Sequence, residues 1–234
     1  MHRAEPPTIP PLSKERELKL AKQFSHYRQN FRVALKVGKQ IFSQNLREAL
    51  WWFEQMLRAF PHHIKNREFV WEVADIYRLH EQYDKASEYI VNIVATSARE
   101  KFIKASICSN NPATAEAALE LCYQLKMEGE YASKYQLLVA FVEATSYYEL
   151  SDYIRARGLI DNALRLIVDA SNSLRLDFLY LRAWTYLKQG NMPSARIDCV
   201  EIKRQSPGGH YSSDFRQHLN TTLLPHDLKQ LLTT

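Results

Sequence analysis

The side chains that could carry out chemistry are scattered along this sequence rather than grouped into motifs. It contains no GxxxxGK[ST] phosphate loop, no GxGxxG, no HExxH and no GxSxG. His62 and His63 follow Pro61, but no Cys or carboxylate cluster accompanies them, which favours a solvated loop over a metal site. Glu143 and Glu149 have no partner at a spacing that would share a proton. We therefore expect no enzyme activity, no cofactor and no metal.

One group of charged side chains has a regular spacing. Four cations recur at intervals of four, four and three residues: Arg28, Arg32, Lys36 and Lys39. On a helix this spacing places them along one side, where they could meet an acidic protein, nucleic acid or an anionic membrane. The alternative, which we favour, is a solvated face opposite the apolar stripe of the same helix. No recognised nucleic-acid motif supports the sharper interpretation.

Composition predicts a helical, soluble chain. Only 6 glycines and 9 prolines occur in 234 residues, and few turn-formers favour long helices over short strands. The net charge of +5 is concentrated in the first 50 residues, which hold ten Lys/Arg against four Asp/Glu. No apolar run approaches the ~20 residues that cross a bilayer. The Pro-rich start does not resemble a secretory signal, and the three cysteines form no C-x-x-C pair, so we expect a cytoplasmic protein.

Helical periodicity covers nearly the whole chain after a Pro-rich arm at residues 1–12. Apolar spacings of three, four and seven, with breaks at Pro61, Pro112, Gly129, Gly190 and Pro207, predict twelve helices. We expect them near 14–43, 46–59, 66–80, 83–97, 99–109, 113–128, 131–150, 152–171, 174–189, 191–205, 212–222 and 225–232. Because the connections are short, neighbouring helices should pack antiparallel, as in a bundle or a solenoid.

An internal repeat favours the solenoid. Three short polar turns are each followed by an alanine, with a tyrosine nine residues before it and another alanine twelve residues before it. The triplets are Ala74, Tyr77 and Ala86; Ala144, Tyr147 and Ala156; and Ala183, Tyr186 and Ala195. Two helices approach closely only where small side chains meet, and an aromatic ring beside that contact fills the remaining space.

These triplets resemble the tetratricopeptide repeat, with its small eighth residue, aromatic eleventh residue and alanine at position twenty. Pro207 lies twelve residues after Ala195, where that family places a proline, and Ala49 with Pro61 looks like a degenerate fourth copy. The family's glycine before the turn is retained only as Gly190. The resemblance implies an all-α fold, a right-handed superhelix of antiparallel helical hairpins over residues 13–210, with capping helices at 211–234. An irregular helical bundle is the alternative.

The resemblance also implies a concave groove lined by the first helix of each hairpin. The positions that correspond to it include Trp71, Asp75, Arg78, Phe141, Tyr148, Tyr180, Trp184 and Lys188. The Lys and Asn with which some family members clamp a C-terminal carboxylate are absent. An aromatic groove suits an apolar helix or peptide, although the chain's own helices at 212–222 and 225–232 could fill it instead. The predicted function is therefore a protein-binding adaptor, scaffold or chaperone-like module; the alternative is a regulatory or nucleic-acid-associated protein that uses its basic N-terminal helix.

Overall fold

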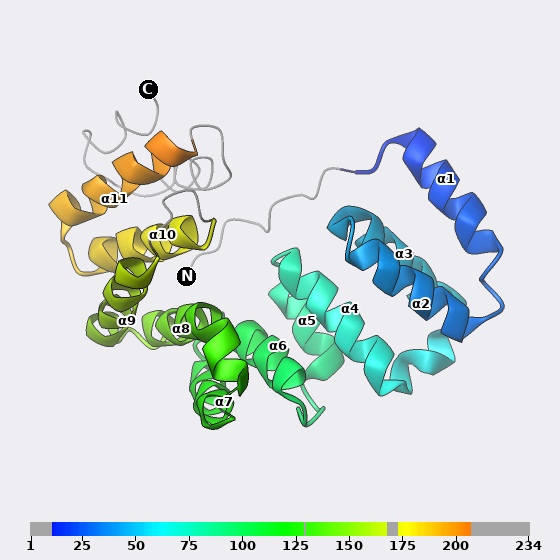
Figure 1. Cartoon of the computed structure of the whole chain (residues 1–234), viewed down its shortest axis with the longest axis horizontal. Coiled ribbons are helices and arrows are strands. Elements are labelled where there is room, and N and C mark those ends of the chain that lie inside the picture. Colours follow the sequence, from blue (N-terminus) through cyan, green and yellow to red (C-terminus); the bar gives the residue numbers. More distant parts are fainter. Residues whose placement is uncertain (1–10, 129, 168–172, 207–234) are drawn as a thin grey trace. The chain divides into compact units, whose positions relative to one another are not determined.

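The computed structural model describes residues 11–128, 130–167 and 173–206, with side chains left undescribed at 130–134. Over these ranges the chain is all-helical, with eleven α-helices, one 3-10 helix and no strand (Figure 1). The helices are α1 (Lys14–Ser25), α2 (Phe31–Phe42), α3 (Leu46–Ala59), η1 (Pro61–Lys65), α4 (Arg67–Leu79), α5 (Tyr83–Ile90), α6 (Ala98–Cys108), α7 (Ala115–Met127), α8 (Glu130–Glu149), α9 (Tyr153–Leu166), α10 (Ser173–Lys188) and α11 (Met192–Gln205). The expected arm at residues 1–12 and the expected helices beyond residue 210 lie almost entirely outside the described residues.

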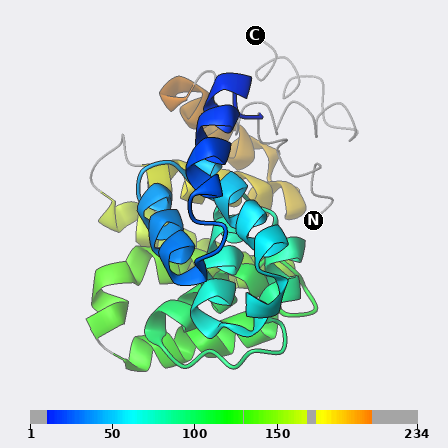
Figure 2. The same ribbon diagram turned by 90° about the vertical axis from the view of Figure 1, so that its right-hand side faces the viewer.

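The described part of the chain divides into two compact units. Of the described residues, 11–107 form the N-terminal unit, and 108–128, 130–167 and 173–206 form the C-terminal unit. In the N-terminal unit α2 packs against α3 and α4 packs against α5, as both ribbon views show (Figures 1 and 2). In the C-terminal unit each helix from α7 to α11 packs against the next. Adjacent helices thus pair as they do in a helical repeat.

The predicted long first helix over 14–43 is wrong, because the chain breaks between α1 and α2. The side-chain oxygen of Asn30 accepts a hydrogen bond from the Val33 amide at 3.2 Å and so begins a new helix. Phe24 on α1 and Phe31 on α2 are both buried, so the apolar stripe continues across the break. The spacing of apolar residues continues from Phe24 to Phe31, so it does not reveal the asparagine cap that lies between them.

The other predicted bounds agree more closely. The prediction of 46–59 coincides with α3, and those for α4, α8 and α10 differ by one residue at each end. The prediction of 83–97 is too long, since α5 ends at Ile90. His62 and His63 lie in η1 rather than in a loop, and the His63 ring stacks on Phe31 with 4.0 Å between ring centroids.

The alanine triplets occupy the positions that the repeat predicts. All six alanines have no exposed surface: Ala74, Ala86, Ala144, Ala156, Ala183 and Ala195. They lie on three pairs of packed helices, α4 with α5, α8 with α9, and α10 with α11. The small residue therefore marks the close contact within each of these hairpins.

The turns of these three hairpins share one backbone geometry. Glu81, Ser151 and Gly190 all have positive φ angles, of 59°, 62° and 73°. Each lies five residues before the second alanine of its triplet. The next amide donates a hydrogen bond to the carbonyl of the triplet's tyrosine in every case, at 2.9, 2.8 and 2.9 Å for Tyr77, Tyr147 and Tyr186. This is the Schellman ending of a helix, so the turn is retained even where its glycine is not.

Gly38 is the small residue that lets α2 and α3 approach closely. A Cβ atom placed on it would lie 2.8 Å from the Phe53 ring and 2.9 Å from the Trp52 ring. The Trp52 indole also donates a hydrogen bond of 3.0 Å to the Ala34 carbonyl, which ties the same two helices together. The contact thus fixes how α2 lies on its partner helix.

We predict that glycine stabilises the protein where a non-glycine residue now adopts the left-handed turn. Glu81→Gly and Ser151→Gly should each raise the free energy of unfolding by about 1 kcal/mol, because that conformation costs an L residue about this much. Glu88→Gly, the same change inside α5, should lower it by a similar amount. Urea unfolding followed by circular dichroism measures all three variants. Destabilisation by both Glu81→Gly and Ser151→Gly would contradict the assignment of the turn.

Candidate functional site

The predicted groove positions on α4 do not share one environment. Trp71 is 2% exposed and belongs to the hydrophobic core of the N-terminal unit, so it offers no surface to a partner. Asp75 and Arg78 form a pair, with two guanidinium nitrogens 2.6 and 2.9 Å from one carboxylate oxygen. The groove positions on this helix therefore hold a buried ring and a largely buried ion pair rather than an exposed aromatic surface.

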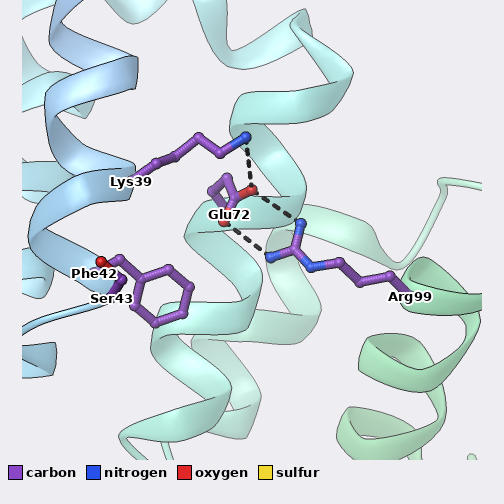
Figure 3. Close-up of a pocket in the computed structure, with 5 residues that line it drawn as sticks. All are labelled: Lys39, Phe42, Ser43, Glu72 and Arg99. Carbon is purple, nitrogen blue, oxygen red and sulfur yellow. Dashed lines mark hydrogen bonds and ion pairs between the residues drawn. The ribbon is translucent and has the colours of Figure 1, made fainter. Parts of the chain in front are cut away.

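This pair belongs to a network of ionised side chains on α2, α4 and α6. The Arg99 guanidinium donates two hydrogen bonds of 2.9 Å to the Glu72 carboxylate and one of 3.0 Å to Asp75. Lys39 approaches Glu72 from the opposite side, with Nζ 3.7 Å from the carboxylate (Figure 3). The ammonium of Lys39 also donates a hydrogen bond of 2.8 Å to Glu68.

The burial of Glu72 explains why two cations meet there. Its side chain is 3% exposed, whereas those of Lys39 and Arg99 are 44% and 48% exposed. A buried carboxylate is costly unless charged or polar partners compensate for the water that it loses. Lys39 and Arg99 supply that compensation while keeping about half of their own surface open to solvent.

Both cations remain charged at neutral pH. The hydrogen bond to Glu68 raises the pKa of Lys39 above its ordinary value. Burial alone would lower the pKa of Arg99, but its bonds to Glu72 and Asp75 outweigh burial and raise it. The positive charges therefore do not titrate near physiological pH.

A pocket opens beside this network. It has a volume of about 480 Å³ and is lined by Lys39, Phe42, Ser43, Glu72 and Arg99. Figure 3 shows the Phe42 ring below Lys39, on the same side of the pocket, with the Arg99 side chain reaching in from α6. The lining therefore combines two half-exposed cations with the Glu72 carboxylate, one aromatic ring and one hydroxyl group.

The start of α6 positions Arg99. Ser97 Oγ accepts a hydrogen bond from the Glu100 amide at 3.2 Å, and the Glu100 carboxylate accepts one from the Ser97 amide at 3.1 Å. This reciprocal pair is a capping box, which fixes where the helix begins. Arg67, the first residue of α4, adds two bonds of 2.9 and 2.6 Å to the same carboxylate. Arg99, between the two capping residues, is thereby aimed at α4.

The predicted basic patch is divided by the break in the first helix. Arg32, Lys36 and Lys39 lie exposed on α2, while Arg28 lies exposed in the turn before it. Among the described residues Arg32 and Lys36 form no ion pair, in contrast to Lys39. The α2 part of the patch therefore runs along one helix and ends at the pocket.

The remaining predicted groove residues belong to the C-terminal unit. Tyr148 and Trp184 are buried there, Phe141 and Tyr180 are half-buried, and Lys188 is exposed. The rings of Tyr180 and Trp184 pack edge to face at 6.3 Å between centroids. The structure thus brings these two aromatic residues together, but it leaves little of their surface for a ligand.

Sequence reasoning missed the two residues at the centre of the network, Glu72 and Arg99. The repeat pattern draws attention to Trp71 and Asp75, on either side of Glu72, and says nothing of the buried carboxylate. A signal for Arg99 was present, since Ser97-x-x-Glu100 is the sequence signature of a capping box. This signature predicts where the helix begins, but it does not predict that the Arg99 side chain reaches α4.

In the described part of the chain no three His, Cys, Asp or Glu side chains come together as metal ligands do. Over the same ranges no helix has both the length and the apolarity that crossing a membrane requires.

Comparison with known proteins returned no match: no family model, no curated protein and no solved structure is significantly similar to this chain.

We predict that Glu100 makes the stability of the protein depend on acid pH. Burial opposes its ionisation, but hydrogen bonds from Arg67 and from Thr96 and Ser97 lower its pKa to about 2. Because an unfolded Glu titrates near 4.3, the ionised carboxylate stabilises the fold above that pH. The stabilisation is lost as the pH falls through 2.

Glu100→Gln should therefore lower the free energy of unfolding by about 2 kcal/mol at pH 7, the scale of hydrogen bonds to a charged group. The difference in free energy of unfolding between the variant and the unaltered protein should become smaller as the pH falls from 5 to 2. Urea unfolding across this range is the measurement, with Glu88→Gln, on the exposed side of α5, as the control. If this difference in free energy does not change with pH, the ionised Glu100 carboxylate does not stabilise the fold as proposed.

Proposed function

We propose that this chain is a non-catalytic, protein-binding module of helical hairpins that holds an acidic segment of a partner protein on α2, α4 and α6. The observation that carries the proposal is the pocket between Lys39 and Arg99, which has a half-exposed cation on each side. The turn geometry shared by three hairpins supports a repeat architecture of the tetratricopeptide kind, and such arrays commonly use the first helix of each hairpin for binding.

The charge balance of this surface favours an acidic partner. Glu72 and Asp75 are buried and already hydrogen bonded, which leaves Glu68 as the exposed carboxylate of the network. Arg32 and Lys36 add two exposed cations on the same helix as Lys39. Carboxylates of a partner would gain charge-assisted hydrogen bonds here, and the excess of cations would speed their encounter with the protein.

The pocket can also accept one apolar side chain. Phe42 is half-buried and lines the pocket beside Ser43. An acidic segment with an apolar residue would place that residue against the Phe42 ring while its carboxylates meet Lys39 and Arg99. The sequence predicts a groove that binds an apolar peptide, but this alternative has less support. Trp71, one of the residues expected to line that groove, is buried in the core.

We predict that peptides selected by the full chain from a random 12-residue library displayed on phage are enriched in Asp and Glu. The double variant Arg32→Glu/Lys36→Glu should bind a synthetic copy of a selected peptide at least tenfold more weakly, measured by fluorescence anisotropy. Folding should be unaffected, since exposed substitutions change stability by about 0.5 kcal/mol or less.

The matched control is Arg47→Glu/Arg58→Glu, which makes the same change in net charge at two exposed arginines of α3. It should leave peptide affinity within about twofold. Equal weakening by both double variants, or no acidic enrichment, would contradict the proposal. A 20-base-pair duplex that binds at physiological salt more tightly than any selected peptide would support the nucleic-acid alternative instead.

A further inference from the structure

Three exposed cations, the cation row, follow one side of α2. Arg32, Lys36 and Lys39 are four and three residues apart. A helix turns by about 100° per residue, so the three side chains leave α2 within a sector of about 60°. No described carboxylate pairs with Arg32 or Lys36, whereas Lys39 contacts Glu68 and Glu72 of α4. The row therefore begins with two charges that the described residues do not neutralise, and it ends at the pocket.

The spacing of the cation row matches that of side chains on a second helix. At a rise of about 1.5 Å per residue, its members are about 6 Å and 4.5 Å apart along α2, and the row spans about 10.5 Å. Carboxylates at i, i+4 and i+7 of a partner helix have the same spacing. On one face of an extended peptide, side chains recur every ~6.7 Å, so the third carboxylate would lie about 3 Å beyond the third cation. A helix therefore meets all three cations in register, and an extended segment does not.

The pocket adds an apolar contact where the cation row ends. Phe42 lies three residues beyond Lys39, within one turn of α2, and is half-buried in the wall of the pocket. Arg99 reaches Glu72 from α6, and Lys39 reaches it from α2 (Figure 3). A partner helix that continues one turn past the carboxylate at Lys39 would bring an apolar residue against the Phe42 ring. The site thus distinguishes an amphipathic acidic helix from an acidic chain of any conformation.

We infer that the partner's acidic segment binds as an α-helix along α2, with carboxylates at helical spacing on the cation row and an apolar residue in the pocket. This inference rests on the proposed function and specifies the conformation and the residue spacing of the segment. The alignment matters because a single exposed ion pair contributes little to binding. A helix brings three such pairs into place on one fixed backbone.

The test compares three synthetic peptides of equal length and composition in an alanine and glutamine background. Each has three glutamates, with one leucine four residues before the first and another four residues after the last. Two peptides carry glutamate at i, i+4 and i+7 or at i, i+3 and i+7, the helical spacings for the two directions of the partner; the third carries it at i, i+2 and i+4. Fluorescence anisotropy with the full chain should show one helical peptide binding at least tenfold more tightly than the third. Equal or tighter binding of the third would overturn the inference.

A charge exchange tests the register. Lys36→Glu should weaken the better helical peptide at least tenfold, and changing the middle glutamate of that peptide to lysine should recover at least fivefold of the loss. The middle position meets Lys36 in either direction of the partner, so the same change at an end glutamate should recover nothing. The matched control protein, Arg47→Glu at an exposed position of α3, should bind the unaltered peptide normally. Equal recovery from the middle and end changes would overturn the inference.

Failure of this inference is distinguishable from failure of the proposed function. A proline midway between the first two glutamates should weaken the better helical peptide at least tenfold, because it breaks a helix. If acidic peptides bind through Arg32 and Lys36 but tolerate this proline, the partner is extended, which overturns the inference and leaves the proposed function intact. If no acidic peptide binds, the proposed function fails as well.

Discussion

The close approach of paired helices is the constraint on which the rest of this structure depends. Two helices can lie close together only where the side chains between them are small. Four hairpins meet this requirement, one through Gly38 on α2 and three through alanines that have no exposed surface. Larger groups fill the space on either side, so each crossing becomes a dense contact that fixes the angle between its helices.

The charged network on α2, α4 and α6 follows from that geometry. Glu72 lies deep enough to lose its water, and the protein compensates with Arg99 and Lys39 from two other helices. The capping box of Ser97 and Glu100 fixes the helix end from which Arg99 reaches. Because the cations are held by their partners and remain half-exposed, they would meet the proposed acidic partner with little further loss of side-chain entropy.

Much of the fold is predictable from local patterns, and the reasons differ between elements. The alanine and tyrosine spacing located three hairpins because a helix crossing accepts few residue types. The turns could not be recognised as equivalent from composition, since Glu81 and Ser151 occupy a conformation that glycine usually takes. The break at Asn30 was missed because the apolar stripe passes through it.

The candidate site was less predictable, because burial depends on contacts between elements that are distant in sequence. The repeat position of Trp71 predicts that it lines an open groove, but it does not reveal whether neighbouring helices cover the ring. The core of the N-terminal unit covers it almost completely. Lys39 was found for its charge and Asp75 for its repeat position, yet the pairing of Glu72 with Arg99 joins residues 27 positions apart.

The free energies of unfolding of Gly38→Ala and Gly158→Ala test this account most directly. Both replace a helical glycine by alanine, a change that by itself stabilises a helix by about 0.5–1 kcal/mol. At Gly158 nothing lies within 4 Å of the new methyl group, so the protein should gain that stability. At Gly38 the methyl group would lie 2.8 Å from Phe53 and 2.9 Å from Trp52, and the protein should lose about 1–3 kcal/mol instead. Opposite signs are the predicted result; equal stabilisation by both substitutions would contradict the claim that close helix contacts determine the fold.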